Sequence, residues 1–440
     1  MFRTVTSRAA PHYEQLRDSG ALREWIERGW VIKTTERPLR DATDAGMRNA
    51  RYLLEHARVP FISYPYEWSF GQLKAAALLH LDLVADALTR GLHLSDASGY
   101  NVQFLGANPV FIDVLSFRQY QRGDYWLGQR QFSEQFLNPL LLRALLGIPH
   151  NAWLRGSPEG IPSADLNAAL PLTRKLSWNV FSQVTLPARV ERKQAATRAG
   201  PTAPRRPLPR AAYRGLIDQL RHWVSKLAAR DATPSVWREY ESMGTYADDE
   251  RRRKRAFVDE FIAAAPPAML WDIGCNTGDY SEVALRADAR YVVGFDADQG
   301  ALDAAYARAS AGDLDFLPLF LDAANPSPNQ GWQQQERCGI EARGPADAIL
   351  ALALVHHLAI GRNVPLPSVL AWLTTLAPRG VVEFVPKNDP AVQRMLAGRE
   401  DVFDAYDVAN FESALTSHAR ILRAETISTA GRRLYIFERP

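Results

Sequence analysis

Five short apolar runs, separated by stretches of helical pattern, dominate residues 268–386. In chain order the runs read AMLWDIG, YVVGFDA, DFLPLFLDA, DAILALALVHH and GVVEFVP. Each run has the length of a strand, and the text between them is long enough for crossover helices. Because the runs are continuously apolar rather than alternating, they are typical of parallel strands covered on both faces. The pattern therefore predicts an α/β domain with a mostly parallel sheet, closed by an antiparallel hairpin that turns at Ala430-Gly431.

The rest of the chain predicts two further regions. Helical patterns over residues 74–88 and 138–146 indicate a separate, mainly helical domain at 1–188. Residues 189–212 are rich in Ala, Pro and Arg and have almost no large apolar side chains, so we expect an exposed basic linker there. The α/β domain would then occupy 213–440 and begin with helical segments at 213–229 and 248–265.

Composition excludes several classes of function. The formal net charge of the 440-residue chain is only +3, which predicts no specific nucleic-acid partner. Its two cysteines, Cys275 and Cys338, form no CxxC or Cys/His cluster, so we expect neither a metal site nor a disulfide framework. The first residues lack the apolar core of a signal peptide, and the longest apolar stretches are too short to span a bilayer. These features predict a cytoplasmic protein.

The stretch WDIGCNTGDYSE, residues 271–282, follows the first predicted strand. Ligands of open parallel sheets bind beyond the carboxyl ends of the strands. Gly274 and Gly278 lack Cβ atoms, so the main chain can turn sharply and approach a ligand closely there. A helix that begins near Asp279 would direct its free N–H groups at the same ligand.

Asp296 ends the second run, 22 residues after Gly274 by the numbering. An acid at this spacing, at the tip of the second strand, can accept hydrogen bonds from a ribose diol. The spacing is compatible with both NAD and S-adenosylmethionine. GCNTG lacks the GxGxxG spacing that a pyrophosphate favours, however, which points away from NAD.

WDIGCNTG resembles the first motif of the class I S-adenosylmethionine-dependent methyltransferases, and the resemblance extends over about residues 235–440. It implies a Rossmann-like sheet with S-adenosylmethionine as cofactor. The turn would lie along the methionine part, Asp296 would hold the ribose, Asp322 would contact the adenine, and Leu352–Val355 would form the fourth strand. The cofactor-binding residues implied by this resemblance are Asp272, Gly274, Cys275, Asn276, Gly278, Asp296, Ala297, Asp322, Ala323, Leu352 and Tyr246.

His356 and His357 lie just past the fourth apolar run, where the resemblance places the reacting methyl group. Histidine titrates near neutral pH, so either residue is a candidate general base; the alternative is that both only cap the strand or contact the cofactor. After the fifth run, Glu383 and Lys387 either line the acceptor side or pair with each other. The NPSP segment at 325–328 follows the third strand, whereas many amino-group methyltransferases carry an NPPY-type motif after the fourth. This favours an oxygen acceptor.

The run ERRRKR, residues 250–255, is interpreted as the solvated face of a helix. It precedes the first strand of the predicted sheet. Tyr246 lies just before it, in a segment that often folds over the cofactor in methyltransferases of this class.

In the N-terminal half, Asp96, Asn101 and Asp113 follow a predicted helix in a pattern similar to the protein kinase and aminoglycoside kinase catalytic loop. The resemblance implies a base at Asp96 and magnesium ligands at Asn101 and Asp113. The pattern is incomplete, because Leu94-Ser95 replaces His-Arg and no glycine-rich phosphate loop precedes it. A degenerate kinase-like accessory domain and an unrelated helical domain both remain open.

The whole chain resembles a group of bacterial methyltransferase-like proteins that includes some linked to nodulation, through segments such as YPYEW and FIDVLSF. The function we expect is S-adenosylmethionine-dependent methyl transfer, to oxygen, on a small-molecule or carbohydrate-like acceptor. Two alternatives stay open: a non-catalytic cofactor-binding scaffold, and phosphotransfer by the N-terminal domain.

Overall fold

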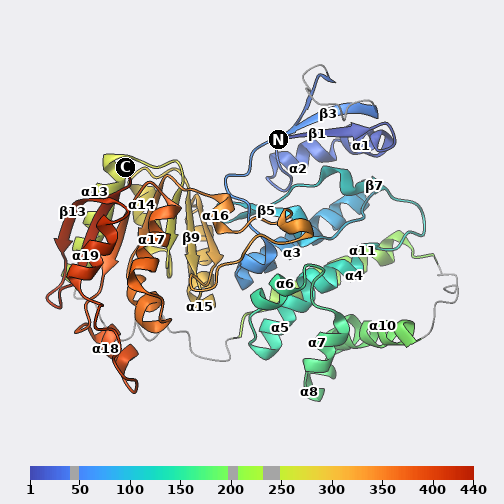
Figure 1. The fold of residues 1–440 in the computed structure, drawn as a ribbon. Coiled ribbons are helices and arrows are strands. Elements are labelled where there is room, and N and C mark those ends of the chain that lie inside the picture. Colours follow the sequence, from blue (N-terminus) through green and yellow to red (C-terminus); the bar gives the residue numbers. More distant parts are fainter. Residues whose placement is uncertain (40–48, 197–206, 231–247) are drawn as a thin grey trace. The chain divides into compact units, whose positions relative to one another are not determined.

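The computed structural model describes residues 1–39, 49–196, 207–230 and 248–440. The chain divides into two compact units, Met1–Thr233 and Pro234–Pro440, and each is described by itself (Figure 1).

The second unit is built on a seven-stranded sheet with the order β10-β9-β8-β11-β12-β14-β13. Its strands are β8 Leu270–Ile273, β9 Val292–Asp296, β10 Phe316–Phe320, β11 Ala348–Ala351, β12 Arg379–Phe384, β13 Arg420–Thr426 and β14 Arg433–Glu438. The first five run parallel, and β14 pairs antiparallel with both β12 and β13. The α/β class and the mostly parallel sheet with an antiparallel C-terminal hairpin are therefore confirmed.

Helices connect these strands as the lengths of the intervening segments predicted. They are α13 Asp248–Ala264, α14 Asp279–Arg286, α15 Gln299–Ala311, α16 Ile340–Arg343, α17 Leu366–Leu376, α18 Pro390–Leu396 and α19 Val408–Thr416, with single turns η8 Trp332–Gln334 and η9 His357–Gly361. The central strands β8 and β11 are buried along their whole length, so both faces of the sheet are covered. Strand order reverses between β8 and β11, which creates a crevice at their carboxyl ends.

The fourth strand lies earlier in the chain than expected. Leu352–Val355 was predicted to form it, but β11 ends at Ala351. Ala353 has a φ of 51°, a left-handed conformation that cannot continue a strand. The prediction was wrong because an apolar run does not reveal the residue at which its main chain turns away from the sheet.

Helices make up most of the first unit, but it also contains three small sheets. Its strands are β1 Phe2–Thr6, β2 Thr34–Arg37, β3 Ala50–His56, β4 Leu92–Leu94, β5 Val102–Leu105, β6 Asn108–Phe111 and β7 Phe117–Gln119. They pair as β1-β3-β2, β4-β7 and β5-β6. Its helices are α1 Ala10–Asp18, α2 Ala21–Glu27, α3 Phe70–Thr89, α4 Gln129–Phe132, α5 Asn138–Leu146, α6 Asn151–Gly156, α7 Ser163–Ala169, α8 Leu172–Lys175, α9 Trp178–Val180, α10 Leu186–Ala196 and α11 Arg210–Lys226, with turns η3 Pro65–Glu67, η4 Gly99–Asn101, η5 Val114–Ser116, η6 Ser133–Leu137 and η7 Phe181–Thr185.

The central helix α3 begins at a capping box, in which Ser69 accepts from the Gln72 amide and Gln72 accepts from the Ser69 amide. These reciprocal bonds satisfy two N–H groups that a helix start leaves without partners. Most of its apolar side chains are buried, so this helix forms the core of the unit.

The boundary between the units lies further along the chain than the sequence indicated. Residues 213–229 were assigned to the α/β domain, but α11 packs against α3 of the first unit. Arg214 donates to the Ala85 carbonyl at 2.9 Å, and Arg221 forms an ion pair with Asp82. The expected linker at 189–212 also begins with helix, because α10 extends to Ala196 and its Ala188 side is buried. Composition alone did not reveal these contacts.

Within the described ranges, none of the helices is both long and apolar enough to cross a membrane.

Candidate functional site

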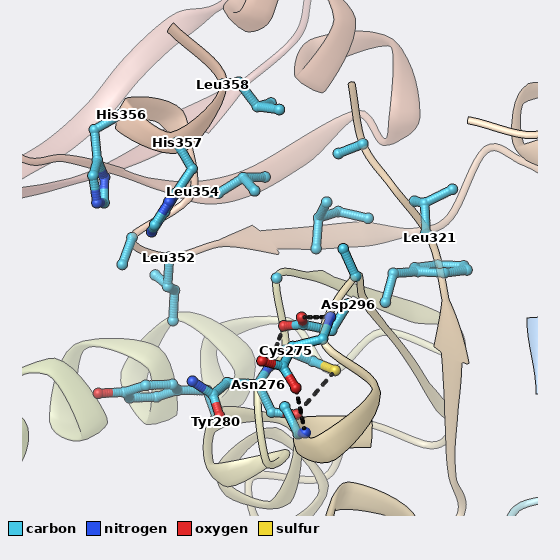
Figure 2. A pocket seen from close by; sticks show the side chains of 18 of the residues that line it. Cys275, Asn276, Tyr280, Asp296, Leu321, Leu352, Leu354, His356, His357 and Leu358 are labelled. Carbon is cyan, nitrogen blue, oxygen red and sulfur yellow. Dashed lines mark hydrogen bonds between the residues drawn. The ribbon is translucent and has the colours of Figure 1, made fainter. Parts of the chain in front are cut away.

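A cavity of about 680 Å³ opens in the second unit at the carboxyl ends of β8, β9, β10 and β11. Figure 2 shows Asn276 and Asp296 close together in its wall, with His356 and His357 further along it. Of the residues predicted from the sequence, the cavity is lined by Gly274, Cys275, Asn276, Asp296, Ala297, Asp322, Ala323, Leu352, His356 and His357. The sheet thus brings together side chains from four separate strand ends.

Two predicted residues among those that the structure describes are not part of this lining. Asp272 lies beneath the turn, and Gly278 lies at its end rather than in the cavity wall. Tyr246 falls within 231–247 and lies outside the described residues.

The turn after β8 has the left-handed main chain that its glycines predicted. Gly274 and Gly278 both have a φ of 83°, and Asn276 between them has a φ of 51°. The amides of Gly274 and Cys275 both donate to the Phe295 carbonyl, at 2.7 and 3.0 Å, which fixes the turn against β9. Asparagine tolerates this conformation better than most residues, so the sequence GCNTG suits the turn.

Gly278 is required for steric reasons as well as for its dihedral angles. A Cβ atom at this position would lie 2.4 Å from Cε1 of Phe316, a buried residue of β10. Gly278 also precedes α14, whose first turn holds Asp279 and Glu282. The bare main chain therefore allows β10, the turn and α14 to pack together.

Asp296, at the end of β9, is fixed by main-chain donors. Its Oδ2 accepts from the Asn276 amide at 2.8 Å, and its Oδ1 accepts from the Asp298 amide at 2.8 Å. Burial raises the pKa of Asp296, although these two hydrogen bonds oppose the shift. A carboxylate has about four lone-pair sites, so acceptor capacity remains for a ligand hydroxyl group.

Asp272 is buried beneath the turn. It is 1% exposed, and its Oδ2 accepts from the Ser281 hydroxyl at 2.7 Å. Burial raises the pKa of Asp272 to about 7. This carboxyl group therefore ties β8 to α14 and lies outside the cavity lining, whereas the resemblance implied that it faces the methionine part of the cofactor.

Beyond β10, Leu321, Asp322 and Ala323 line the cavity. Asp322 accepts from the Ala324 amide at 3.0 Å and lies 3.2 Å from the Arg362 guanidinium. The Asp322 carboxylate and the main chain beside it can accept hydrogen bonds from, and donate them to, a heterocyclic amine.

His356 and His357 follow β11, and their ring centroids lie 4.3 Å apart. His356 is 1% exposed, and among the described residues its Nδ1 has no hydrogen-bond partner. Burial lowers the pKa of His356 well below the usual value, and burial together with Arg432 lowers the pKa of His357 to about 4. Both shifts run against the expectation that these side chains titrate near neutral pH, because the buried site disfavours a further positive charge beside existing cations.

A buried ion pair that the sequence did not reveal lies beside the histidines. Lys254 of α13 donates from Nζ to Oε2 of Glu383 at 2.5 Å, and the Ala353 amide donates to the same oxygen at 2.7 Å. Lys254 is 2% exposed and Glu383 is fully buried. The Lys254 ammonium also lies 5.0 Å from the centroid of the Tyr280 ring, a cation–π contact.

A second buried pair continues this network. Arg432, just before β14, binds Asp389 through Nε and Nη2 at 2.6 and 2.9 Å, and its Nη1 lies 3.6 Å from Oε1 of Glu383. Asp389 is also the N-cap of α18 and accepts from the Ala391 amide. The network joins α13, β12, α18 and the β13–β14 turn around one end of the cavity.

Two predictions about charged residues are corrected by this network. The run 250–255 is exposed at most positions, as expected, but Lys254 is buried. Glu383 pairs with Lys254 rather than with Lys387, which instead binds Asp401 at 2.9 Å. The only feature of the sequence that pointed to this buried pair was the acid inside the apolar run GVVEFVP, because a carboxylate buried in a strand requires a partner.

The kinase-like pattern of the first unit is not confirmed, and its three residues are held by contacts within the protein. Asp113 forms an ion pair with Arg3 at 2.5 Å and accepts from the Ser116 hydroxyl. Asn101 is held next to it, because the Ile112 amide donates to the Asn101 carbonyl at 2.9 Å. Asp96 accepts from the Ser98 amide. Across the part of the chain that the structure describes, no three His, Cys, Asp or Glu side chains are grouped so as to hold a metal ion.

Comparison with known proteins gave a relative that aligns with most of the chain. No protein-family model matches the chain. The chain is 48% identical over 390 residues to the nodulation protein NoeA of Rhizobium meliloti (strain 1021). The alignment covers 88% of this chain and 82% of that protein.

Solved structures of methyltransferases overlap the chain in part. Magnesium protoporphyrin IX methyltransferase (ChlM) of Synechocystis PCC 6803 with bound SAH is 20% identical, covering 43% of this chain and 84% of that one, with a TM-score of 0.32. The N-methyltransferase NodS of Bradyrhizobium japonicum WM9 is 14% identical, covering 43% of this chain and 97% of that one, with a TM-score of 0.33.

Proposed function

The chain belongs to the family of the nodulation protein NoeA, and from this premise we propose that it is an S-adenosylmethionine-dependent methyltransferase. The observation that carries the proposal is the contact between Asp296 and the turn Gly274–Gly278 inside an open cavity. A fixed carboxylate beside exposed main chain suits a ribose next to an amino-acid tail. The fold of the second unit supports the same cofactor.

The residues of the cavity fit this cofactor. Asp296 would accept from the ribose hydroxyl groups, and the turn with Asn276 would lie along the methionine part. Asp322 and Ala323 would contact the adenine. Leu352 and Leu354 supply apolar wall. A volume of about 680 Å³ also leaves room for a second small molecule, since ligand pockets are on the order of 300–1,000 Å³.

Methyl transfer to oxygen is the chemistry we propose for the reacting end. When bound, S-adenosylmethionine would supply a methyl group activated on its sulfonium, and the acceptor oxygen would receive it, leaving S-adenosylhomocysteine. His356 or His357, the pKa values of which are lowered by burial, would receive the proton of the acceptor hydroxyl. A small-molecule or carbohydrate-like alcohol is the acceptor class.

Calorimetry with S-adenosylhomocysteine and S-adenosylmethionine tests the proposal. We expect wild-type protein to bind both, and Asp296→Ala to bind them about 10- to 100-fold more weakly, since hydrogen bonds to a charged group contribute about 1.5–3 kcal/mol. Asp401→Ala removes an exposed carboxylate outside the cavity and is the matched control. If the wild type gives no heat with either compound, the proposal fails. Binding without methyl transfer to any alcohol would instead support the scaffold alternative.

A further inference from the structure

Charge is distributed unevenly along the cavity. Asp296 ends β9, and Asp298 and Asp322 follow β9 and β10, on one side of the strand-order reversal. Arg362, which pairs with Asp322, also lines the cavity and offsets one of these three acids. Lys254 and Arg432 line the other side, next to β11, β12 and β14. The cavity therefore has an acidic cofactor side and a basic side beside His356 and His357.

The carboxylates that hold these two cations are not part of the cavity wall. Glu383 and Asp389 are 0% and 2% exposed and do not line the cavity, whereas Lys254 and Arg432 do. Each ion pair is therefore oriented with its positive end toward the cavity. Asp279, an acid on the lining near Lys254, is bound by Arg308 at 2.6 Å.

The basic side is also poorly hydrated. Lys254 and Arg432 are 2% and 4% exposed, and in such surroundings a charge is less screened than in water. The pKa of His357 is lowered by burial and then by Arg432, which is consistent with a positive field at this end. An anion that binds here would form charge-assisted hydrogen bonds with Lys254 and Arg432. Both cations would keep their carboxylate partners.

We propose that the region lined by Lys254 and Arg432 binds an anionic group of the methyl acceptor: a carboxylate, a sulfate or a phosphate. This inference rests on the proposed methyltransferase function and narrows its acceptor to an acidic alcohol. The same chemistry could be supplied by the carboxylate of the cofactor itself. The turn Gly274–Gly278 is the place we assign to the cofactor's amino-acid tail, so we assign the basic side to the acceptor.

The first experiment measures anion binding to the full-length protein saturated with S-adenosylhomocysteine. Benzoate, inorganic sulfate and inorganic phosphate are titrated by calorimetry, with sodium chloride at matched ionic strength as the control for screening. We expect at least one of the three to bind in the millimolar range. A protein that binds S-adenosylhomocysteine but none of the three overturns the inference and leaves the proposed function standing. A protein that does not bind S-adenosylhomocysteine defeats the proposed function itself.

The second experiment assigns the anion to these residues. Arg432→Gln alone would leave Asp389 buried and unpaired, so it is combined with Asp389→Asn, which keeps a neutral hydrogen-bonding pair. We expect this double variant to bind the anion at least tenfold more weakly. Lys254→Gln with Glu383→Gln tests the other pair in parallel. Lys387→Gln, which removes a cation outside the cavity, is the control and should leave anion affinity unchanged. Unchanged affinity in both double variants contradicts the inference.

The third experiment separates the two sources of the anion. S-adenosylhomocysteine carries the amino-acid carboxylate, and 5′-methylthioadenosine lacks it. If the basic side binds the acceptor, the Arg432 and Asp389 double variant should bind both nucleosides as the wild type does, which also shows that the variant is folded. Loss of S-adenosylhomocysteine affinity alone would assign the basic side to the cofactor and overturn the assignment to the acceptor. If the variant binds neither nucleoside, the Lys254 and Glu383 double variant decides by the same criterion.

Discussion

Lys254 Nζ lies 2.5 Å from Oε2 of Glu383, although 129 residues separate them in the sequence. The contact joins the helix that precedes the sheet to its fifth parallel strand. Glu383 also accepts from the Ala353 amide, within the left-handed turn that leads to the two histidines. One carboxylate therefore fixes both a cavity cation and the turn beside it.

Removal of Lys254 should strongly destabilise the second unit. Lys254→Ala leaves the Glu383 carboxylate buried with its main partner missing, and breaking a buried pair in this way costs about 3–5 kcal/mol. Arg252→Ala, two residues away on the exposed face, should change the free energy of unfolding by no more than about 0.5 kcal/mol. Urea unfolding of the two variants measures the difference. Equal stabilities would show that Glu383 finds another partner.

Gly278→Ala should abolish binding of S-adenosylhomocysteine. The new methyl group would lie 2.4 Å from the Phe316 ring, so either the turn or β10 has to move. Gly398→Ala is a matched control, because Gly398 has a φ of 80° but no atom within 4 Å of the added carbon. It isolates the cost of the left-handed conformation, about 1–2 kcal/mol. Calorimetry and thermal unfolding of both variants would show whether the steric effect exceeds the backbone effect. Equal losses would mean that it does not.

The stability of the second unit should respond to the titration of Asp272. Its pKa rises from about 3.8 when unfolded to about 7 when folded, so the folded state binds the proton more tightly. The resulting stabilisation is complete below pH 4 and is lost as the pH rises through 7, by at most about 4 kcal/mol. Asp272→Asn should remove this loss, so its melting temperature should fall less than that of the wild type between pH 4 and 8. Parallel pH profiles for both proteins would contradict the prediction.

The two histidines should act in the opposite direction. The pKa of His357 is lowered from about 6.5 to about 4, so its contribution to stability is present above pH 6.5 and is lost as the pH falls through 4. His357→Gln should reduce the acid sensitivity of the protein. Proton NMR of the imidazole signals, assigned with His356→Gln and His357→Gln, gives the titration directly. A midpoint near 6.5 for His357 would show that the site is more solvated than its burial indicates.

The sheet of the second unit was predictable because its signals are local. AMLWDIG, YVVGFDA and DFLPLFLDA each contain the strand that forms, and the turn at Ala430-Gly431 falls between β13 and β14. The end of β11 was not predicted because it depends on the left-handed main chain of Ala353. An alanine in the sequence does not indicate that conformation. The first unit was less predictable, since strands such as β4 and β7 have three residues each and depend on pairing partners over 20 residues away.

The candidate site also has a part that the sequence predicted and a part that it did not. Gly274, Asn276 and Asp296 lie on adjacent strand ends, so the motif spacing correctly predicted that they lie close together. Lys254 and Arg432 come from segments on either side of the strands that form the cavity, and their burial depends on carboxylates that only the tertiary structure supplies. A lysine within ERRRKR is indistinguishable by sequence from its solvated neighbours.

Asp296 already has an amide donor on each of its oxygens, one from the turn after β8 and one from the start of the next segment. This wall of the crevice is consequently preorganised, so a ribose bound here would not lose affinity to the entropy of ordering a loop. Association at this wall should thus be limited by diffusion and desolvation rather than by rearrangement of the protein.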